Sequence, residues 1–200
     1  TAADVDGDGD LDVLSAAGGD DKIAWYENDG SETFTEHTIT TAANGARSVT
    51  TADVDGDGDM DVLSASYYDD KIAWYENDGS ESFTAHTITT AADGPYSVTT
   101  ADVDGDGDMD VLSASVNDNK IAWYENDGSE TFTAHTITTA AAYAFSVTTA
   151  DVDGDGDLDV LSASASTVVN ENKIAWYEND GSETFTAHII STAAAGAFSV

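Results

Sequence analysis

The fold of this chain is decided by a nine-residue stretch, Asp4-Val5-Asp6-Gly7-Asp8-Gly9-Asp10-Leu11-Asp12. The stretch carries five aspartates, and neighbouring carboxylates repel one another by about 1 kcal/mol per pair at ~4 Å even in water. A folded chain holds such a cluster only around something cationic. Aspartate at the first, third and fifth positions, followed by glycine at the sixth, is typical of the first half of a calcium-binding loop. We therefore predict that this stretch wraps one Ca²⁺ ion.

The predicted ligands are oxygen atoms, the donors that Ca²⁺ prefers. They are the carboxylates of Asp4, Asp6, Asp8 and Asp12 and the backbone carbonyl of Asp10. Gly9 permits the sharp turn that a side chain would obstruct. In a helix–loop–helix calcium site the twelfth position is glutamate, whereas here it is Ser15, and β-branched residues typical of strands flank the loop. The last ligand is therefore expected at the ninth position, between two strands.

The same stretch recurs at fixed spacing, with copies that begin at residues 4, 53, 102 and 151. Four regularly spaced copies argue against the alternative, a solvated acidic turn that binds no metal. We expect one Ca²⁺ per repeat. The predicted calcium loops contain Asp4, Asp6, Asp8, Asp10, Asp12, Asp53, Asp55, Asp57, Asp59, Asp61, Asp102, Asp104, Asp106, Asp108, Asp110, Asp151, Asp153, Asp155, Asp157 and Asp159.

The pattern D-x-D-G-D-G-x-x-D between strands resembles the calcium loops of FG-GAP/VCBS repeats, the propeller-blade repeats also found in integrin alpha subunits. The resemblance covers all four repeats and so nearly the whole chain. It implies β-propeller blades, bound calcium and membership among large, extracellular, adhesion-like proteins.

The charge of the chain excludes several classes of function. Asp and Glu number 40 against 5 Lys and Arg, which gives a net charge of −35 at neutral pH. Nucleic acids require a basic surface, and anionic membrane surfaces would repel this chain. No apolar run is long enough to span a membrane. There is no cysteine, so stability must come from packing and metal. Exposed and strongly acidic calcium loops suit an extracellular location, where calcium is abundant.

Internal repetition sets the domain organisation. The repeats are residues 1–49, 50–98, 99–147 and 148–200, and the fourth carries a four-residue insertion near 167–170. The second and third repeats are identical at 41 of 49 positions, which suggests recent amplification, deliberate design or a segment of a longer array.

Each repeat is predicted to form four strands. In the third repeat these are residues 97–101, 110–115, 120–125 and 132–138, because Val, Ile, Thr and aromatic residues favour strands. The sequence Asn126-Asp127-Gly128 predicts a tight turn between the last two. Ile121 and Trp123 share one face and are expected in the core. Phe132 and Ile137 are both apolar but are separated by an odd number of residues, so a regular strand would place them on opposite faces. We therefore predict that the last strand contains a β-bulge or starts after Phe132.

The strand at residues 110–115 is apolar or small on both faces, which fits sheets stacked face to face, as in a propeller. We therefore predict an all-β fold of four-stranded, β-propeller-type blades. Three assemblies stay open: a closed ring, half of an eight-bladed ring made by two chains, or an open superhelical array. The first strand of repeat 1 retains only residues 1–3 and is completed by residues 196–200 or by a preceding repeat.

Differences between repeats concentrate at one end of the blades. In an antiparallel blade the calcium loop and the Asn-Asp-Gly turn share one end, so the two variable loops share the other. These loops are rich in aromatic residues, either because they bind a ligand or because nothing constrains them. The candidate ligand face consists of Arg47, Tyr67, Tyr68, Tyr96 and Tyr143. One histidine per repeat is interpreted as a polar surface residue rather than a zinc ligand.

The repeats hardly break their symmetry, whereas an enzyme needs one asymmetric site. We therefore predict a non-enzymatic, calcium-binding extracellular or cell-surface module with an adhesive or structural role, either by itself or as a segment of a long repetitive surface or fibre-forming protein. The alternative is a lectin-like protein that binds glycans through the candidate ligand face. The expected partners are calcium, further copies of the chain in a dimer or filament, and glycans or surface proteins.

Overall fold

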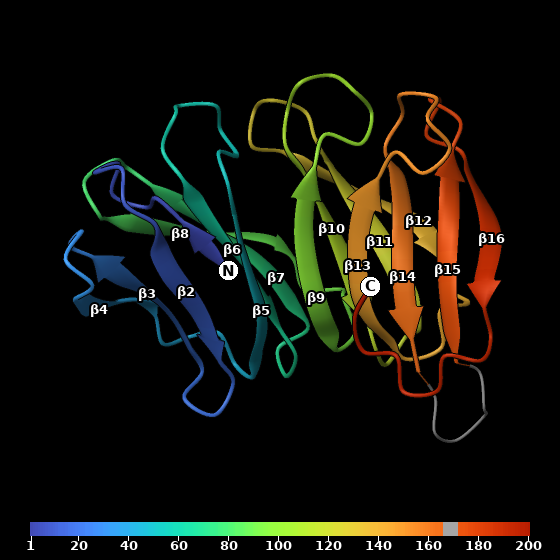
Figure 1. Cartoon of the computed structure of the whole chain (residues 1–200), viewed down its shortest axis with the longest axis horizontal. Coiled ribbons are helices and arrows are strands. Elements are labelled where there is room, and N and C mark those ends of the chain that lie inside the picture. Colours follow the sequence, from blue (N-terminus) through green and yellow to red (C-terminus); the bar gives the residue numbers. More distant parts are fainter. Residues whose placement is uncertain (166–171) are drawn as a thin grey trace.

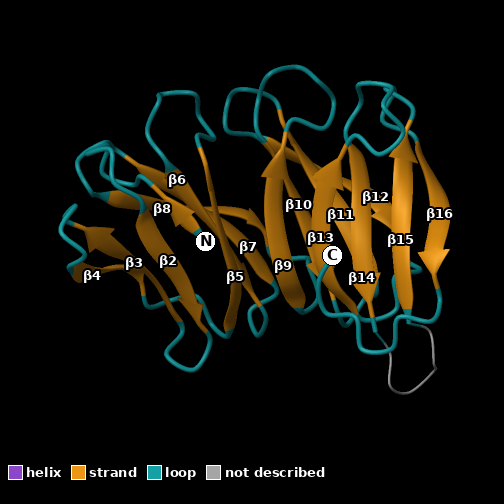
Figure 2. Cartoon of the chain, in the orientation of Figure 1, coloured by secondary structure: helices purple, strands orange, loops and turns teal. Residues whose placement is uncertain are grey.

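The computed structural model describes residues 1–165 and 172–200. The predicted insertion near residues 167–170 lies outside the described residues. The part of the chain that is described contains strands and loops but no helix (Figure 2). Its strands form four antiparallel sheets of four strands each, which we call blades 1 to 4. The predicted all-β fold of repeated four-stranded blades is therefore confirmed.

In every blade the strands follow one another in sequence order across the sheet. Blade 1 contains β1 (Ala2–Ala3), β2 (Asp12–Ala17), β3 (Lys22–Asn28) and β4 (Phe34–Thr40). Blade 2 contains β5 (Ala46–Ala52), β6 (Asp61–Ser66), β7 (Lys71–Asn77) and β8 (Phe83–Thr89). Blade 3 contains β9 (Pro95–Ala101), β10 (Asp110–Ser115), β11 (Lys120–Asn126) and β12 (Phe132–Thr138). Blade 4 contains β13 (Ala144–Ala150), β14 (Asp159–Ser164), β15 (Lys173–Asn179) and β16 (Phe185–Ser191).

The predicted strands of the third repeat agree closely with those of blade 3. Two have the predicted bounds, β9 begins two residues earlier, and β11 ends one residue later. The β-bulge is confirmed, because Ile121 pairs with Thr138 while Ala122 pairs with Thr136. The extra residue is Ile137, which the bulge allows to pack against the same core as Ile121 and Trp123.

The hydrophobic cores lie between blades, because each blade has two different apolar faces. We call one the tryptophan face, which in blade 3 consists of Leu112, Ile121 and Trp123. The other is the tyrosine face, represented in blade 4 by Val160, Ala175 and Tyr177. One core joins these two faces, and equivalent cores join blades 1 and 2 and blades 2 and 3.

The inner strands β5, β9 and β13 lie side by side (Figure 1). A row of serines links them. Ser48 Oγ accepts a hydrogen bond from the Val98 backbone N–H at 3.3 Å, and Ser97 Oγ accepts one from Val147 at 3.4 Å. Among the described residues, hydrophobic cores join blades 1 and 2, 2 and 3, and 3 and 4 but not blades 4 and 1, so the blades form an open arrangement. Residues 197–200 form no strand.

A buried asparagine side chain also joins each blade to the one before it. Asn126 Nδ2 donates to the Val54 carbonyl of blade 2 at 3.0 Å and to the Met109 carbonyl at 3.3 Å. In blade 1 the equivalent Asn28 donates to the Leu11 carbonyl at 3.2 Å, and within the described residues it reaches no carbonyl of another blade.

We expect Asn126→Ala to lower the free energy of unfolding by about 1–3 kcal/mol, because it leaves the buried Val54 carbonyl without its donor. Urea unfolding monitored by tryptophan fluorescence measures the loss. The matched control is Asn28→Ala, which breaks no contact between blades and should cost less. Equal losses in the two variants would show that the bond to Val54 adds nothing to stability.

Candidate metal centre

Each acidic loop is folded by its own backbone around its first aspartate. In blade 1, Asp4 accepts hydrogen bonds from the backbone N–H groups of Gly7 at 2.8 Å and Gly9 at 3.0 Å. The φ angle of Gly9 is 98°, in the region that favours glycine, so the sequence-based reason for this glycine is confirmed. The loop thereby turns its carboxylates toward a common centre.

The ninth residue of the loop is its buried anchor. Asp61 is fully buried, and its two carboxylate oxygens accept the Val54 N–H at 2.9 Å and the Asn77 N–H at 2.8 Å. Asp12, Asp110 and Asp159 are equally buried and accept the equivalent pairs of bonds. Burial raises the pKa of Asp61 and of Asp110 to about 6, although their backbone donors lower it. Ionising these side chains therefore has a cost that a nearby cation would offset.

The loop carboxylates converge to metal-binding distances in all four blades. In blades 1 and 2 one oxygen from each of the first, third and fifth aspartates lies within 4.8 Å of the others. In blades 3 and 4 the first, third and ninth aspartates do so. The sets are Asp4, Asp6 and Asp8; Asp53, Asp55 and Asp57; Asp102, Asp104 and Asp110; and Asp151, Asp153 and Asp159.

The seventh aspartate of each loop has a different position. A Cβ atom added to Gly79 would collide with the Asp59 carboxylate, so this side chain lies against the turn between β7 and β8. The equivalent Asp10, Asp108 and Asp157 lie against Gly30, Gly128 and Gly181. With its side chain held at this turn, the seventh residue keeps its backbone carbonyl as the predicted ligand.

The donor set fits calcium. It consists of carboxylate oxygens, which suit a hard cation, and burial together with neighbouring carboxylates raises the pKa of the third aspartate in every loop. Among the described residues no lysine or arginine forms an ion pair with a loop aspartate. The first, third, fifth and ninth aspartates and the seventh carbonyl would hold the ion. Its positive charge would relieve the repulsion between them.

Sequence reasoning missed one member of the site, the asparagine of the Asn-Asp-Gly turn. We call the acidic loop, its buried ninth aspartate and this turn the acidic corner of the blade. Asn77 donates its backbone N–H to Asp61 and its side-chain amide to the Val5 carbonyl of blade 1 at 2.9 Å. The corner thus joins two blades as well as two loops. The signal was the asparagine at the same position of every repeat, but a hairpin turn alone also favours it.

The histidines occupy a fixed structural position. His135 stacks on Trp123 with ring centroids 4.5 Å apart, and its Nε2 lies 2.7 Å from Glu125 Oε2. The other three blades repeat this stacked pair. Each histidine therefore stacks on the tryptophan of its blade, which is buried in blades 1 to 3 and half-buried in blade 4.

Four residues of the candidate ligand face come together at the end opposite the acidic loops. The Arg47 guanidinium lies 5.5 Å from the Tyr67 ring centroid and 5.6 Å from that of Tyr96. Tyr67 meets Tyr68 edge to face at 5.2 Å, and 64% of Tyr68 is exposed. Tyr143 does not join these contacts. It is 38% exposed, and its N–H donates to Asn119 Oδ1 at 2.9 Å.

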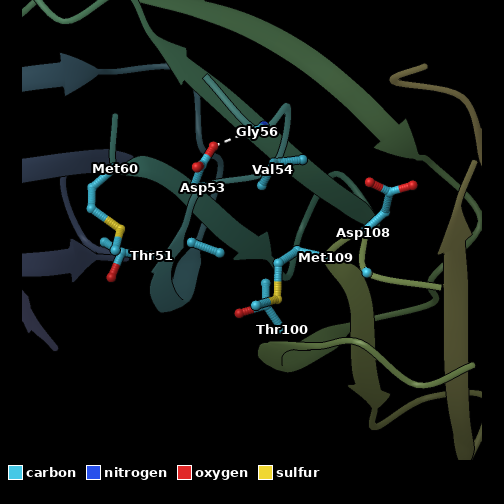
Figure 3. A pocket seen from close by; sticks show the side chains of 10 residues that line it. Thr51, Asp53, Val54, Gly56, Met60, Thr100, Asp108 and Met109 are labelled. Carbon is cyan, nitrogen blue, oxygen red and sulfur yellow. Dashed lines mark hydrogen bonds between the residues drawn. The ribbon is translucent and has the colours of Figure 1, made fainter. Parts of the chain in front are cut away.

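A groove of about 400 Å³ opens between blades 2 and 3 at the end that carries the acidic loops (Figure 3). Its walls combine Asp53 and Asp108 with Met60 and Met109. Sequence reasoning did not predict this groove, since it depends on how far apart two blades lie.

The fold and the repeated acidic corner define a repeat protein built of β-propeller-type blades. The FG-GAP-like repeat family matches residues 4–64, 53–113 and 102–162, and the chain belongs to this family. The predicted resemblance is therefore confirmed. No curated protein sequence matches the chain.

Solved structures share the fold at low sequence identity. A lectin from Agrocybe aegerita that recognises non-reducing terminal N-acetylglucosamine has a TM-score of 0.63 at 18% identity, over 95% of this chain and 52% of the lectin. The biofilm matrix protein Bap1 of V. cholerae has a TM-score of 0.58 at 22% identity, over 92% of this chain and 27% of Bap1. A putative 6-phosphogluconolactonase from Bacteroides uniformis has a TM-score of 0.56 at 14% identity, over 95% of this chain and 55% of that protein. The chain thus spans about half or less of the length of these proteins.

None of the described residues belongs to a helix that could cross a membrane.

We expect Asp55→Asn to reduce the number of calcium ions bound by one, because it removes a converging carboxylate from one loop only. Isothermal titration calorimetry of the folded chain gives this number. The control is Asp59→Asn in the same loop, where the side chain lies against Gly79 and the backbone carbonyl is kept. Loss of a site in the control but not in Asp55→Asn would show that the ligands are wrongly assigned.

The buried anchors predict how pH affects the metal-free protein. Folding raises the pKa of Asp61 and Asp110 from 3.8 to about 6, so their contribution to stability is present below ~pH 4 and is lost as pH rises through about 6. In chelator, the free energy of unfolding in urea should therefore be larger at ~pH 5 than at ~pH 7.5. Calcium should reverse this order, because it binds the ionised carboxylates. A metal-free protein that is less stable at the lower pH would contradict the assignment.

Proposed function

We propose that this chain is a non-enzymatic, calcium-stabilised repeat module with an adhesive or structural role outside the cell. The observation that carries the proposal is the acidic corner, which recurs in every blade with converging carboxylates that, in the part of the chain described, pair with no lysine or arginine. In the proposal, one calcium ion per corner offsets part of the negative charge of the loop and so stabilises the seam between blades. The predicted self-association, as a dimer or filament, belongs to the same role.

An extracellular location is supported by the acidic loops and by the similarity of the fold to that of a matrix protein. Exposed loops that depend on calcium suit compartments where this ion is abundant. The similarity to a biofilm matrix protein, although it is a similarity of fold alone, agrees with a structural role in a matrix. Because the chain has no cysteine, its stability depends on packing between blades and, in the proposal, on calcium.

A non-enzymatic role is supported by the symmetry of the site. Every blade carries the same loop, the same buried aspartate and the same His–Glu pair, so no blade concentrates distinct catalytic groups. The similarity to a putative lactonase extends only to the fold.

Lectin-like glycan binding is the second candidate, and a specific observation favours it. The cluster of Arg47, Tyr67, Tyr68 and Tyr96 presents aromatic rings beside a cation, an arrangement able to stack on sugar rings and donate hydrogen bonds. The groove between blades 2 and 3 offers a second place for a sugar.

Retention of the purified chain on cell surfaces and on a glycan array separates the two roles. The adhesive proposal expects retention in calcium that is lost in chelator and is unchanged in the double variant Arg47→Ala, Tyr68→Ser. The lectin alternative expects specific glycan binding that this variant weakens about tenfold or more. No retention on any surface or glycan in calcium would contradict both roles.

A further inference from the structure

A second cluster of candidate metal ligands lies outside the acidic corners, where blade 4 meets blade 3. It consists of Glu125 on β11, His135 on β12 and Glu183 in the turn between β15 and β16. One ligand atom from each side chain, the imidazole nitrogen or a carboxylate oxygen, lies within 4.8 Å of the other two. None of the three belongs to an acidic loop, so the calcium assignment makes no use of them.

Two contacts fix the orientation of the His135 ring. The ring stacks on the fully buried Trp123, with centroids 4.5 Å apart and planes inclined by 24°. Its Nε2 atom lies 2.7 Å from Glu125 Oε2. The two side chains keep 33% and 31% of their surface exposed, so an ion from solvent can reach them. The ring therefore presents Nε2 to the cluster without having to be reordered first.

Contacts on both sides hold the turn that carries Glu183 against blade 3. Before the turn, Asn179 Nδ2 donates to the Val103 carbonyl at 3.0 Å. After it, Phe185 packs against the core shared by blades 3 and 4, with its ring centroid 6.4 Å from that of Trp123. The backbone of Glu183 thus has a fixed place beside blade 3, while its exposed side chain can turn toward an ion.

The charge of the cluster favours a cation. Two carboxylates and a neutral imidazole carry two negative charges, which one divalent ion would balance. Among the ion pairs of the described residues, none joins Glu125 or Glu183 to a lysine or an arginine. The basic partner that Glu125 does have is His135 itself.

The donor set selects a different metal from that of the acidic loops. Calcium takes oxygen ligands, whereas imidazole nitrogen suits zinc. Three protein ligands that include histidine, with water at the fourth position, are typical of open tetrahedral zinc sites. Bonds of about 2.0–2.1 Å would place the ligand atoms roughly 3.3 Å apart. To reach this spacing the His135–Glu125 pair opens slightly, and the exposed Glu183 closes by at most about 1.5 Å.

The other two blade interfaces carry the same residue types at equivalent positions. They are Glu27, His37 and Glu81 between blades 1 and 2, and Glu76, His86 and Glu130 between blades 2 and 3. Each of these histidines also lies 2.7 Å from the glutamate of its own blade. In the part of the chain that is described, the set between blades 3 and 4 is the one that meets the 4.8 Å distance. The other two sets therefore serve as internal references.

We propose that Glu125, His135 and Glu183 form a zinc site that clamps blade 4 to blade 3 beside the outer strands of blade 3. Zinc replaces the proton that His135 Nε2 shares with Glu125, and the imidazole carries its remaining proton on Nδ1. Water completes the four ligands. The site goes beyond the proposed function, because it uses another metal and none of the aspartates that would hold calcium. Sequence reasoning set the histidine aside because Glu183 belongs to the next blade.

Nitrogen-15 NMR spectra of the histidine side chains test the site directly, because the chain has only four histidines. The protein is first given saturating calcium, so that zinc does not compete for the acidic corners, and zinc chloride is then added. The His135 signal is assigned by its absence from His135→Gln. We expect this signal to shift and saturate, with Nε2 as the bound nitrogen. An unchanged His135 signal in excess zinc would overturn the inference.

Replacing Glu183 distinguishes a three-ligand site from an isolated histidine–glutamate pair. Glu183→Gln keeps the size of an exposed side chain but removes its charge, so the circular dichroism spectrum should stay the same. The zinc affinity measured at the His135 signal should fall about tenfold or more, at least the loss that follows removal of a second-shell partner. The matched control is Glu130→Gln, at the same position of the turn in blade 3, which should leave this affinity unchanged. Equal affinities in the two variants would overturn the inference.

Competition between the metals separates this site from the acidic corners. Excess calcium should not displace zinc from His135, because calcium has little preference for nitrogen; displacement would overturn the inference. The proposed function and this inference can also fail separately. A chain whose His135 signal responds to zinc but which binds no calcium contradicts only the proposed function. A chain that binds calcium while His135 ignores zinc contradicts only the inference.

Discussion

The structure depends on a carboxylate held inside the protein at the corner of every blade. In blade 3, Asp110 is fully buried and accepts one hydrogen bond from the start of the acidic loop and one from the end of β11. The same asparagine that donates its N–H to Asp110 reaches the preceding blade with its side chain. One corner therefore holds a loop, two strands and a blade interface together, and it does so next to four more aspartates. We propose that a bound cation compensates this charge at neutral pH, because the chain has only five lysine and arginine side chains.

The two-faced blade explains why the repeats belong together. A single four-stranded sheet with apolar residues on both faces cannot bury them alone, but a stack of such sheets buries every face except the two at its ends. The small residues of the second strand, such as Ala114, allow the sheets to approach closely. Larger residues from the neighbouring strand, Ile121 and Trp123, fill the space between them. Stability in this design is thus a property of the interfaces and not of the individual repeat.

The sequence predicted the blade well because its signals are local and repeated four times. The period, the strands, the bulge at Ile137 and the turn-forming glycines follow from residue types and parity. The convergence of the acidic side chains also followed, since spacing within one loop determines it. The asparagine bridge to the preceding blade did not, because it depends on the distance between two elements 72 residues apart in the chain. The contact of Arg47 with two tyrosines, one of them on another blade, was equally beyond local reasoning.

The central claim is that divalent ions at the acidic corners hold the stacked blades together. Differential scanning calorimetry of the whole chain, in calcium and then in excess chelator, tests it most directly. The account predicts a midpoint that rises with calcium concentration, as expected for a ligand that binds only the folded chain, and falls when chelator removes the ion. A midpoint that is the same in calcium and in chelator would contradict the account.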